Sequence, residues 1–130
     1  MSPDLRRTLT RGVSAVFVVW GAVQLAAPEA TVRTVTPDVP EPRAWIVRVL
    51  GARMVLQHGL ALTRPTRGVV LAGSAVDALH AASMVALCLG WRRYRRPALV
   101  SAVSAAVSAL GQLATAPAAP PAPPPVRVRT

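Results

Sequence analysis

Residues 45–90 read WIVRVLGARMVLQHGLALTRPTRGVVLAGSAVDALHAASMVALCLG, and this stretch decides the fold. Two long apolar runs, 45–63 and 68–90, are separated by a short turn that contains the helix-breaking residue Pro65. As a helix, each run is long enough to cross most of a hydrocarbon core about 30 Å thick. We therefore expect a transmembrane helical hairpin.

Polar side chains interrupt both apolar runs and form the candidate site: Arg53 and Gln57 in the first, Asp77 and His80 in the second. Arg53 lies twelve residues before Pro65, and Asp77 lies twelve residues after it. In an antiparallel hairpin both are then at one depth, about 18 Å from the turn. Because a lone charge at that depth costs about 2.5–3.5 kcal/mol, we predict an Arg53–Asp77 ion pair buried between the two helices.

The same register predicts the neighbours of this pair. Gln57 falls opposite Gly73, where the missing side chain leaves room for an amide. His80 lies at the edge of the helix face that carries the aspartate. His58 points away from Arg53 on the first helix and is close to the turn, so we expect it to reach the membrane interface.

A third apolar run, 12–27, follows a basic N-terminal segment, 1–11. The small-residue pattern of a signal-peptide cleavage site is poor after this run, so we interpret it as an uncleaved first span. Residues 28–44 contain four prolines and predict a loop outside the membrane, with a short helical turn near 29–35.

The fourth apolar run is 97–115. Small residues recur along it at three- and four-residue spacing, and they therefore share one helix face: Ser101, Ser104, Ser108 and Gly111. Such a face lets helices approach closely in lipid, and we expect it to pack within the bundle rather than against a second copy. Residues 12–116 thus predict an all-α, four-helix transmembrane bundle with up-down topology. Residues 117–130, PAAPPAPPPVRVRT, predict a Pro-rich disordered tail.

The distribution of charge along the chain indicates which classes of partner the protein binds. The net charge is +10, yet the fifteen basic residues are all arginine and lie mostly in short clusters beside apolar runs. This pattern is typical of membrane segments and not of a nucleic-acid interface. We expect the lipid bilayer as partner, together with another membrane protein or a second copy, and a multi-pass location in the cell (inner) membrane. The single cysteine, Cys88, offers no disulfide or metal site.

Two functional interpretations remain open. The favoured one is a non-enzymatic structural or accessory subunit whose ion pair sets the register of the helices. The alternative is a small proton-coupled transporter that uses Asp77 and His80, since ionisable residues inside membranes often mark functional sites. A proton carrier must titrate near neutral pH, whereas a neighbouring Arg53 favours the charged carboxylate. We expect no catalytic residues, no metal site and no cofactor; His58 and His80 are offset by about 12 Å, which rules out a shared haem.

Two segments, GARMVLQHG (51–59) and VDALHAASM (76–84), resemble small, uncharacterised four-span bacterial integral membrane proteins. The shared features are a Gly-x-Arg-x-x-x-Gln pattern on one helix and Asp-x-x-His on the next. The resemblance covers about 45–115. It implies a four-span bundle, and it implies no activity.

Overall fold

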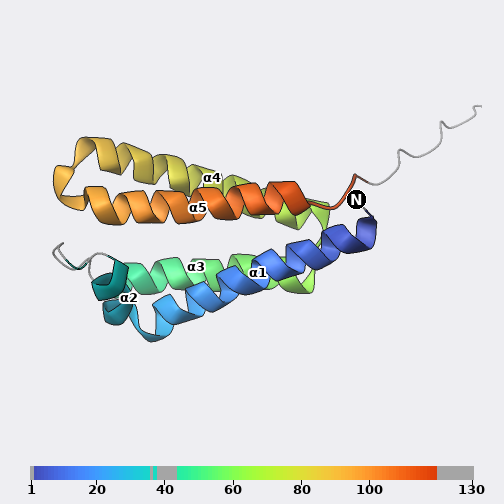
Figure 1. The fold of residues 1–130 in the computed structure, drawn as a ribbon, viewed down its shortest axis with the longest axis horizontal. Coiled ribbons are helices and arrows are strands. Elements are labelled where there is room, and N and C mark those ends of the chain that lie inside the picture. Colours follow the sequence, from blue (N-terminus) through green and yellow to red (C-terminus); the bar gives the residue numbers. More distant parts are fainter. Residues whose placement is uncertain (1, 36, 38–43, 120–130) are drawn as a thin grey trace, which may run out of the picture.

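The computed structural model describes residues 2–35, 37 and 44–119. The elements in those residues are all helices: α1 (Pro3–Ala26), α2 (Pro28–Val35), α3 (Ala44–Thr63), α4 (Arg67–Gly90), the short 3₁₀-helix η1 (Arg92–Tyr94) and α5 (Arg95–Thr115). The predicted all-α class is confirmed. Successive long helices run in opposite directions, and the first and last helices begin and end at the same end of the bundle (Figure 1).

Most helix boundaries agree with the sequence pattern, and the short helix near 29–35 is confirmed as α2. The exception is α1, which begins at Pro3 although the apolar run begins at residue 12. Ser2 caps this helix by accepting a hydrogen bond from the backbone N–H of Leu5 at 3.2 Å, and Pro3 and Asp4 suit its first turn. The basic segment is therefore helical. The predicted disorder of the tail concerns mainly residues 120–130, which lie outside the described residues.

The four long helices form two layers. Helix α1 packs along α3, and α4 packs along α5, whereas α3 and α4 approach one another far less (Figure 1). The expectation that the two helices of residues 45–90 pack mainly against each other is therefore wrong. The two arms are connected and antiparallel, but each belongs to a different layer.

Two glycines explain the close pairing of α1 with α3. A Cβ atom built on Gly51 would lie 2.6 Å from the backbone oxygen of Gly21, and a Cβ on Gly21 would lie 2.8 Å from the oxygen of Gly51. Contacts this short leave no space for any side chain, so the two backbones touch at this crossing. In the other layer, the Ser74 hydroxyl of α4 donates to the Ala109 carbonyl of α5 at 3.0 Å. The buried apolar residues of α5 are all alanines: Ala98, Ala102, Ala105 and Ala109.

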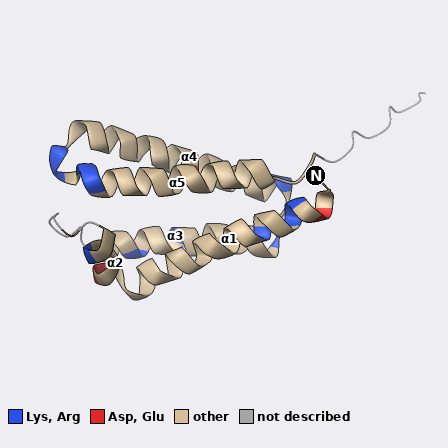
Figure 2. Cartoon of the chain, viewed as in Figure 1, with Lys and Arg blue, Asp and Glu red and all other residues tan. Residues whose placement is uncertain are grey.

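The distribution of polar groups is the reverse of that in a water-soluble bundle. Large apolar side chains cover the outside; Leu56 and Leu79 are 75% and 73% exposed. Most of the largest fully buried side chains are polar, among them His58, Gln112 and Asp77. Basic residues gather at the two ends of the bundle, while the middle of α1, α4 and α5 has none (Figure 2).

Among the described residues, three helical segments are long and apolar enough to cross a membrane: Pro3–Ala26, Arg67–Gly90 and Arg92–Thr115. Helix α3, predicted as the second span, is not one of them. Its sequence contains Arg48, Arg53, Gln57 and His58, which lower its hydropathy. Arg53, Gln57 and His58 have partners inside the bundle, as shown below, and so they do not have to face lipid, whereas Arg48 is exposed.

We predict that Gly51→Ala lowers the stability of the protein, because its methyl group meets the backbone of α1. The expected loss is about 1–3 kcal/mol. Gly59→Ala is the matched control on the same helix, since a Cβ there meets nothing within 4 Å, and it should leave stability unchanged or raise it by up to about 1 kcal/mol. Unfolding in detergent with increasing SDS measures both variants. Equal effects of the two substitutions would show that the helices do not cross at Gly51.

Candidate functional site

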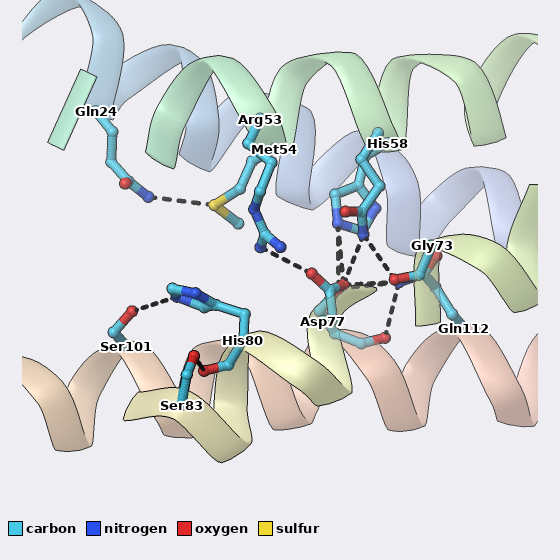
Figure 3. A network of polar contacts seen from close by, with 12 residues as sticks. Gln24, Arg53, Met54, His58, Gly73, Asp77, His80, Ser83, Ser101 and Gln112 are labelled. Atoms are coloured by element: carbon cyan, nitrogen blue, oxygen red, sulfur yellow. Dashed lines mark hydrogen bonds and ion pairs between the residues drawn. The ribbon is translucent and has the colours of Figure 1, made fainter. Parts of the chain in front are cut away.

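The carboxylate of Asp77 is the centre of the site (Figure 3). It is 1% exposed and accepts hydrogen bonds from four side chains. Arg53 Nη2 donates to Oδ1 at 2.8 Å, which confirms the predicted ion pair. Oδ2 accepts from Gln57 Nε2 at 2.8 Å, from Gln112 Nε2 at 2.9 Å and from the Ser108 hydroxyl.

These hydrogen bonds join the two layers. Arg53 and Gln57 come from α3, whereas Asp77 comes from α4 and Ser108 from α5. An ionised carboxylate offers about four lone-pair sites, two on each oxygen; here Oδ1 accepts one hydrogen bond and Oδ2 accepts three. A buried charge is tolerated when it is paired and hydrogen-bonded in this way. The site is therefore a cross-link at mid-bundle as well as an ion pair.

Gly73 makes room for this arrangement. Gln57 Nε2 also donates to the backbone oxygen of Gly73 at 3.1 Å, so the predicted opposition of these two residues is confirmed. A Cβ on Gly73 would lie 2.6 Å from Gln112 Oε1 and 3.4 Å from Gln57 Cγ. Both amide side chains thus lie over the bare backbone of α4. The Gln112 amide would have to move if residue 73 had a side chain, whereas the contact with Gln57 would be an ordinary one.

His58 is buried in the network, and the expectation that it reaches the interface is wrong. The side chain is 0% exposed, and its Nε2 lies 3.1 Å from the Ser108 hydroxyl and 3.7 Å from Asp77 Oδ2. The imidazole stacks on the ring of Phe17 at a centroid distance of 4.9 Å. Helices α1 and α5 both cover this flank of α3, which helical periodicity within α3 alone could not indicate.

His80 is close to the network without belonging to it. It lies one turn beyond Asp77 on α4, and its Nε2 is 2.9 Å from the hydroxyl of Ser101 (Figure 3). Its hydrogen bond therefore goes to α5 and not to the carboxylate. Of the four predicted site residues, Arg53, Gln57 and Asp77 are directly bonded, and His80 is not.

The serines of α5 were predicted to serve helix packing, and this was incomplete. Ser101 bonds to His80 and Ser108 bonds to Asp77, whereas Ser104 makes no hydrogen bond to another described residue. Gly111 acts as a spacer, since a Cβ there would lie 3.3 Å from Val13 of α1. Gln112 was missed entirely. It is the one long polar side chain within 97–115 and lies four residues after Ser108, so it shares that helix face. That spacing was the available signal.

Several buried polar atoms of the site have no hydrogen-bond partner among the described residues: Arg53 Nε, Gln57 Oε1, His58 Nδ1 and Gln112 Oε1, together with Ser14 Oγ on α1. The two amide groups turn their nitrogens toward Asp77, and their oxygens are left over. Four of these five atoms belong to residues of the network. Arg53 Nε is thus a donor without an acceptor, Gln57 Oε1 and Gln112 Oε1 are acceptors without a donor, and the role of His58 Nδ1 depends on the tautomer of the ring.

A serine, a histidine and an aspartate meet here, but their order does not suit nucleophilic catalysis. In a hydrolase the histidine lies between the other two and accepts the serine proton. Here the Ser108 hydroxyl donates directly to Asp77, and His58 Nδ1 has no partner among the described residues. No group of three His, Cys, Asp or Glu that could hold a metal ion occurs in the described part of the chain.

A cavity of about 600 Å³ lies between the two layers. It extends from the network to the end of the bundle where α2 and η1 lie, because its wall includes Thr31 and Val35 of α2 and Tyr94 of η1. Near the network its polar wall residues are Arg53, Asp77, His80, Ser101, Ser104 and Ser108. Most of the remaining wall is apolar.

The different positions of the two histidines lead to a prediction. His58→Ala removes a fully buried ring and leaves a void, and we expect it to cost at least about 2 kcal/mol of stability. His80→Ala removes a partly exposed side chain on a cavity wall and one hydrogen bond, with an expected cost of about 1 kcal/mol or less. SDS-induced unfolding of the two variants gives the comparison. A larger loss for His80→Ala would contradict the positions described here.

Comparison of the chain with protein-family models, with curated proteins and with solved structures finds no match. The function of the site is therefore inferred from its residues and their geometry alone.

Proposed function

We propose that this chain is a multi-pass protein of the cell (inner) membrane in which α1, α3, α4 and α5 all cross the bilayer. The observation that supports this most is the inverted polarity of the bundle, with leucine and valine outside and hydrogen-bonded polar groups inside. Three helical segments have suitable length and apolarity. Helix α3 is included as a fourth span because its central polar side chains bond within the bundle.

We further propose a non-enzymatic role, as a structural or accessory subunit whose partners are the lipid bilayer and another membrane protein or a second copy. The observation that carries this proposal is that the buried Asp77 carboxylate accepts hydrogen bonds from four side chains, which come from helices of both layers. Three of these donors converge on Oδ2 and one on Oδ1, and together they fix one layer against the other. Polar groups buried in this manner can specify the register of packed helices.

The membrane placement predicts how the protein fractionates. After expression, the chain should stay in the membrane fraction through high-salt and alkaline washes and should leave it only with detergent. The reason is that apolar side chains cover its outer surface and require lipid or detergent. A purified chain that stays monodisperse in buffer without detergent would contradict the proposal.

The structural role predicts the result of a double-mutant cycle. Arg53→Leu and Asp77→Leu should each cost about 3–5 kcal/mol, because each leaves a buried charge unpaired. The double variant should be more stable than either single variant. Its remaining donors keep other acceptors, since Gln57 also bonds the Gly73 carbonyl and Gln112 also bonds the Ser108 carbonyl, at 3.1 and 3.4 Å. SDS-induced unfolding in detergent measures all four proteins, and additive losses would contradict the proposed role.

The second candidate is a small proton-coupled transporter that uses Asp77 and His80. One observation favours it: both side chains lie on the wall of the cavity. The same variants distinguish the two candidates. If the double variant remains inserted and folded but loses a transport activity that the unchanged protein has, the transporter is favoured and the purely structural role is wrong.

A further inference from the structure

The cavity between the layers has an inner end that differs from the rest of its wall. Arg53, His80 and Ser104 lie one helical turn from Gln57, Asp77 and Ser108, in each case toward the end of the bundle where α2 lies. These three residues thus place a guanidinium, an imidazole and a hydroxyl at the same depth in the bundle. Beyond them the wall is formed mainly by apolar side chains, such as Trp20, Leu50 and Met84.

Unused hydrogen-bond donors occur at this inner end. The ion pair occupies Arg53 Nη2, while no hydrogen bond joins Arg53 Nη1 to another described residue, and the side chain is 27% exposed. No hydrogen bond joins the hydroxyl of Ser104 to any other described residue. A ligand that enters the cavity therefore meets donors that lack an acceptor, and an acceptor atom on the ligand would satisfy them.

The charge of the inner end restricts the ligand further. Arg53 and Asp77 are directly paired, so their charges balance. The other arginine of the wall, Arg93, is on η1 at the opposite end of the cavity. An ion placed beside the Arg53–Asp77 pair would therefore have no partner of its own there and would lose its hydration. A ligand without net charge avoids that cost, and an apolar body suits the remaining wall. The volume of about 600 Å³ is within the range of small-molecule sites.

We propose that this cavity binds an uncharged, mainly apolar small molecule whose carbonyl oxygen accepts hydrogen bonds from Arg53 and Ser104. Such a molecule partitions into lipid and can reach the cavity from the bilayer. This inference is separate from the structural role of Asp77, because it requires donors that the network leaves unused. The network can hold the layers together whether or not the cavity is filled.

Trp20 provides the measurement, since it lies on the cavity wall. The chain has three tryptophans, and in the full-length Trp45→Phe/Trp91→Phe variant Trp20 is the sole one. The protein is reconstituted in phosphatidylcholine nanodiscs and titrated with duroquinone, an uncharged quinone that quenches tryptophan fluorescence. We expect a saturable quenching component in addition to the linear one that comes from quinone dissolved in lipid.

Variants at one position test the site. Ser104→Phe fills the inner end and should abolish the saturable component, whereas Val107→Phe, at an exposed position on the same helix, should keep it. Ser104→Ala preserves the space and removes the hydroxyl, and it should weaken duroquinone binding about threefold to tenfold. Circular dichroism and gel filtration confirm that each variant is folded.

Competition tests the chemistry of the ligand. Tetralone, which has a carbonyl, should displace duroquinone, while tetralin, the same ring system without oxygen, should displace it far less, and the anion naphthoate should not. The proposal is overturned if tetralin or naphthoate competes as well as tetralone, if Ser104→Ala binds duroquinone unchanged, or if quenching is linear in the protein that carries only the tryptophan substitutions.

Discussion

A carboxylate in a medium of low dielectric constant needs a partner for its charge and hydrogen-bond donors around it, and the fold of this protein depends on how Asp77 meets that requirement. Its partners come from α3 and α5, and Asp77 itself is on α4. The long helices on both sides of the bundle are thereby held at one register. If lipid surrounds the bundle, as proposed, helices gain little from burying apolar surface against one another, and directed polar bonds of this kind fix their positions.

The two-layer arrangement follows from where small residues permit close contact. The Gly21–Gly51 crossing pairs α1 with α3, and α5, whose buried apolar residues are alanines, packs along α4. Between the layers, contact is made at mid-bundle by the network and near the chain termini, where the Thr10 hydroxyl donates to the Thr115 carbonyl at 2.9 Å. Toward α2 there is a cavity instead. The hydrogen-bond network of Asp77 therefore joins the two layers and also forms the inner end of the cavity between them.

How much of this could be read from the sequence depends on how local each feature is. The Arg53–Asp77 pair could be predicted, because one turn at Pro65 fixes the relative depth of two connected helices. The surroundings of His58 could not, because they depend on α1 and α5, which are distant in sequence. The serines of α5 were ambiguous, since a hydroxyl serves close packing and hydrogen bonding equally well. The start of α1 was missed although Ser2-Pro3-Asp4 is a recognisable helix-start signal.

The most direct test of the central claim is the separation of the Arg53 guanidinium nitrogens from the Asp77 carboxyl carbon in the protein reconstituted in lipid bilayers. Solid-state NMR with labelled arginine and aspartate measures it through the carbon–nitrogen dipolar coupling, and Arg53→Lys identifies the signal. The account predicts strong dephasing of one aspartate carboxyl signal, as expected for directly hydrogen-bonded groups. Absence of that dephasing in a folded, inserted protein would mean that the two side chains point apart, and it would contradict the account.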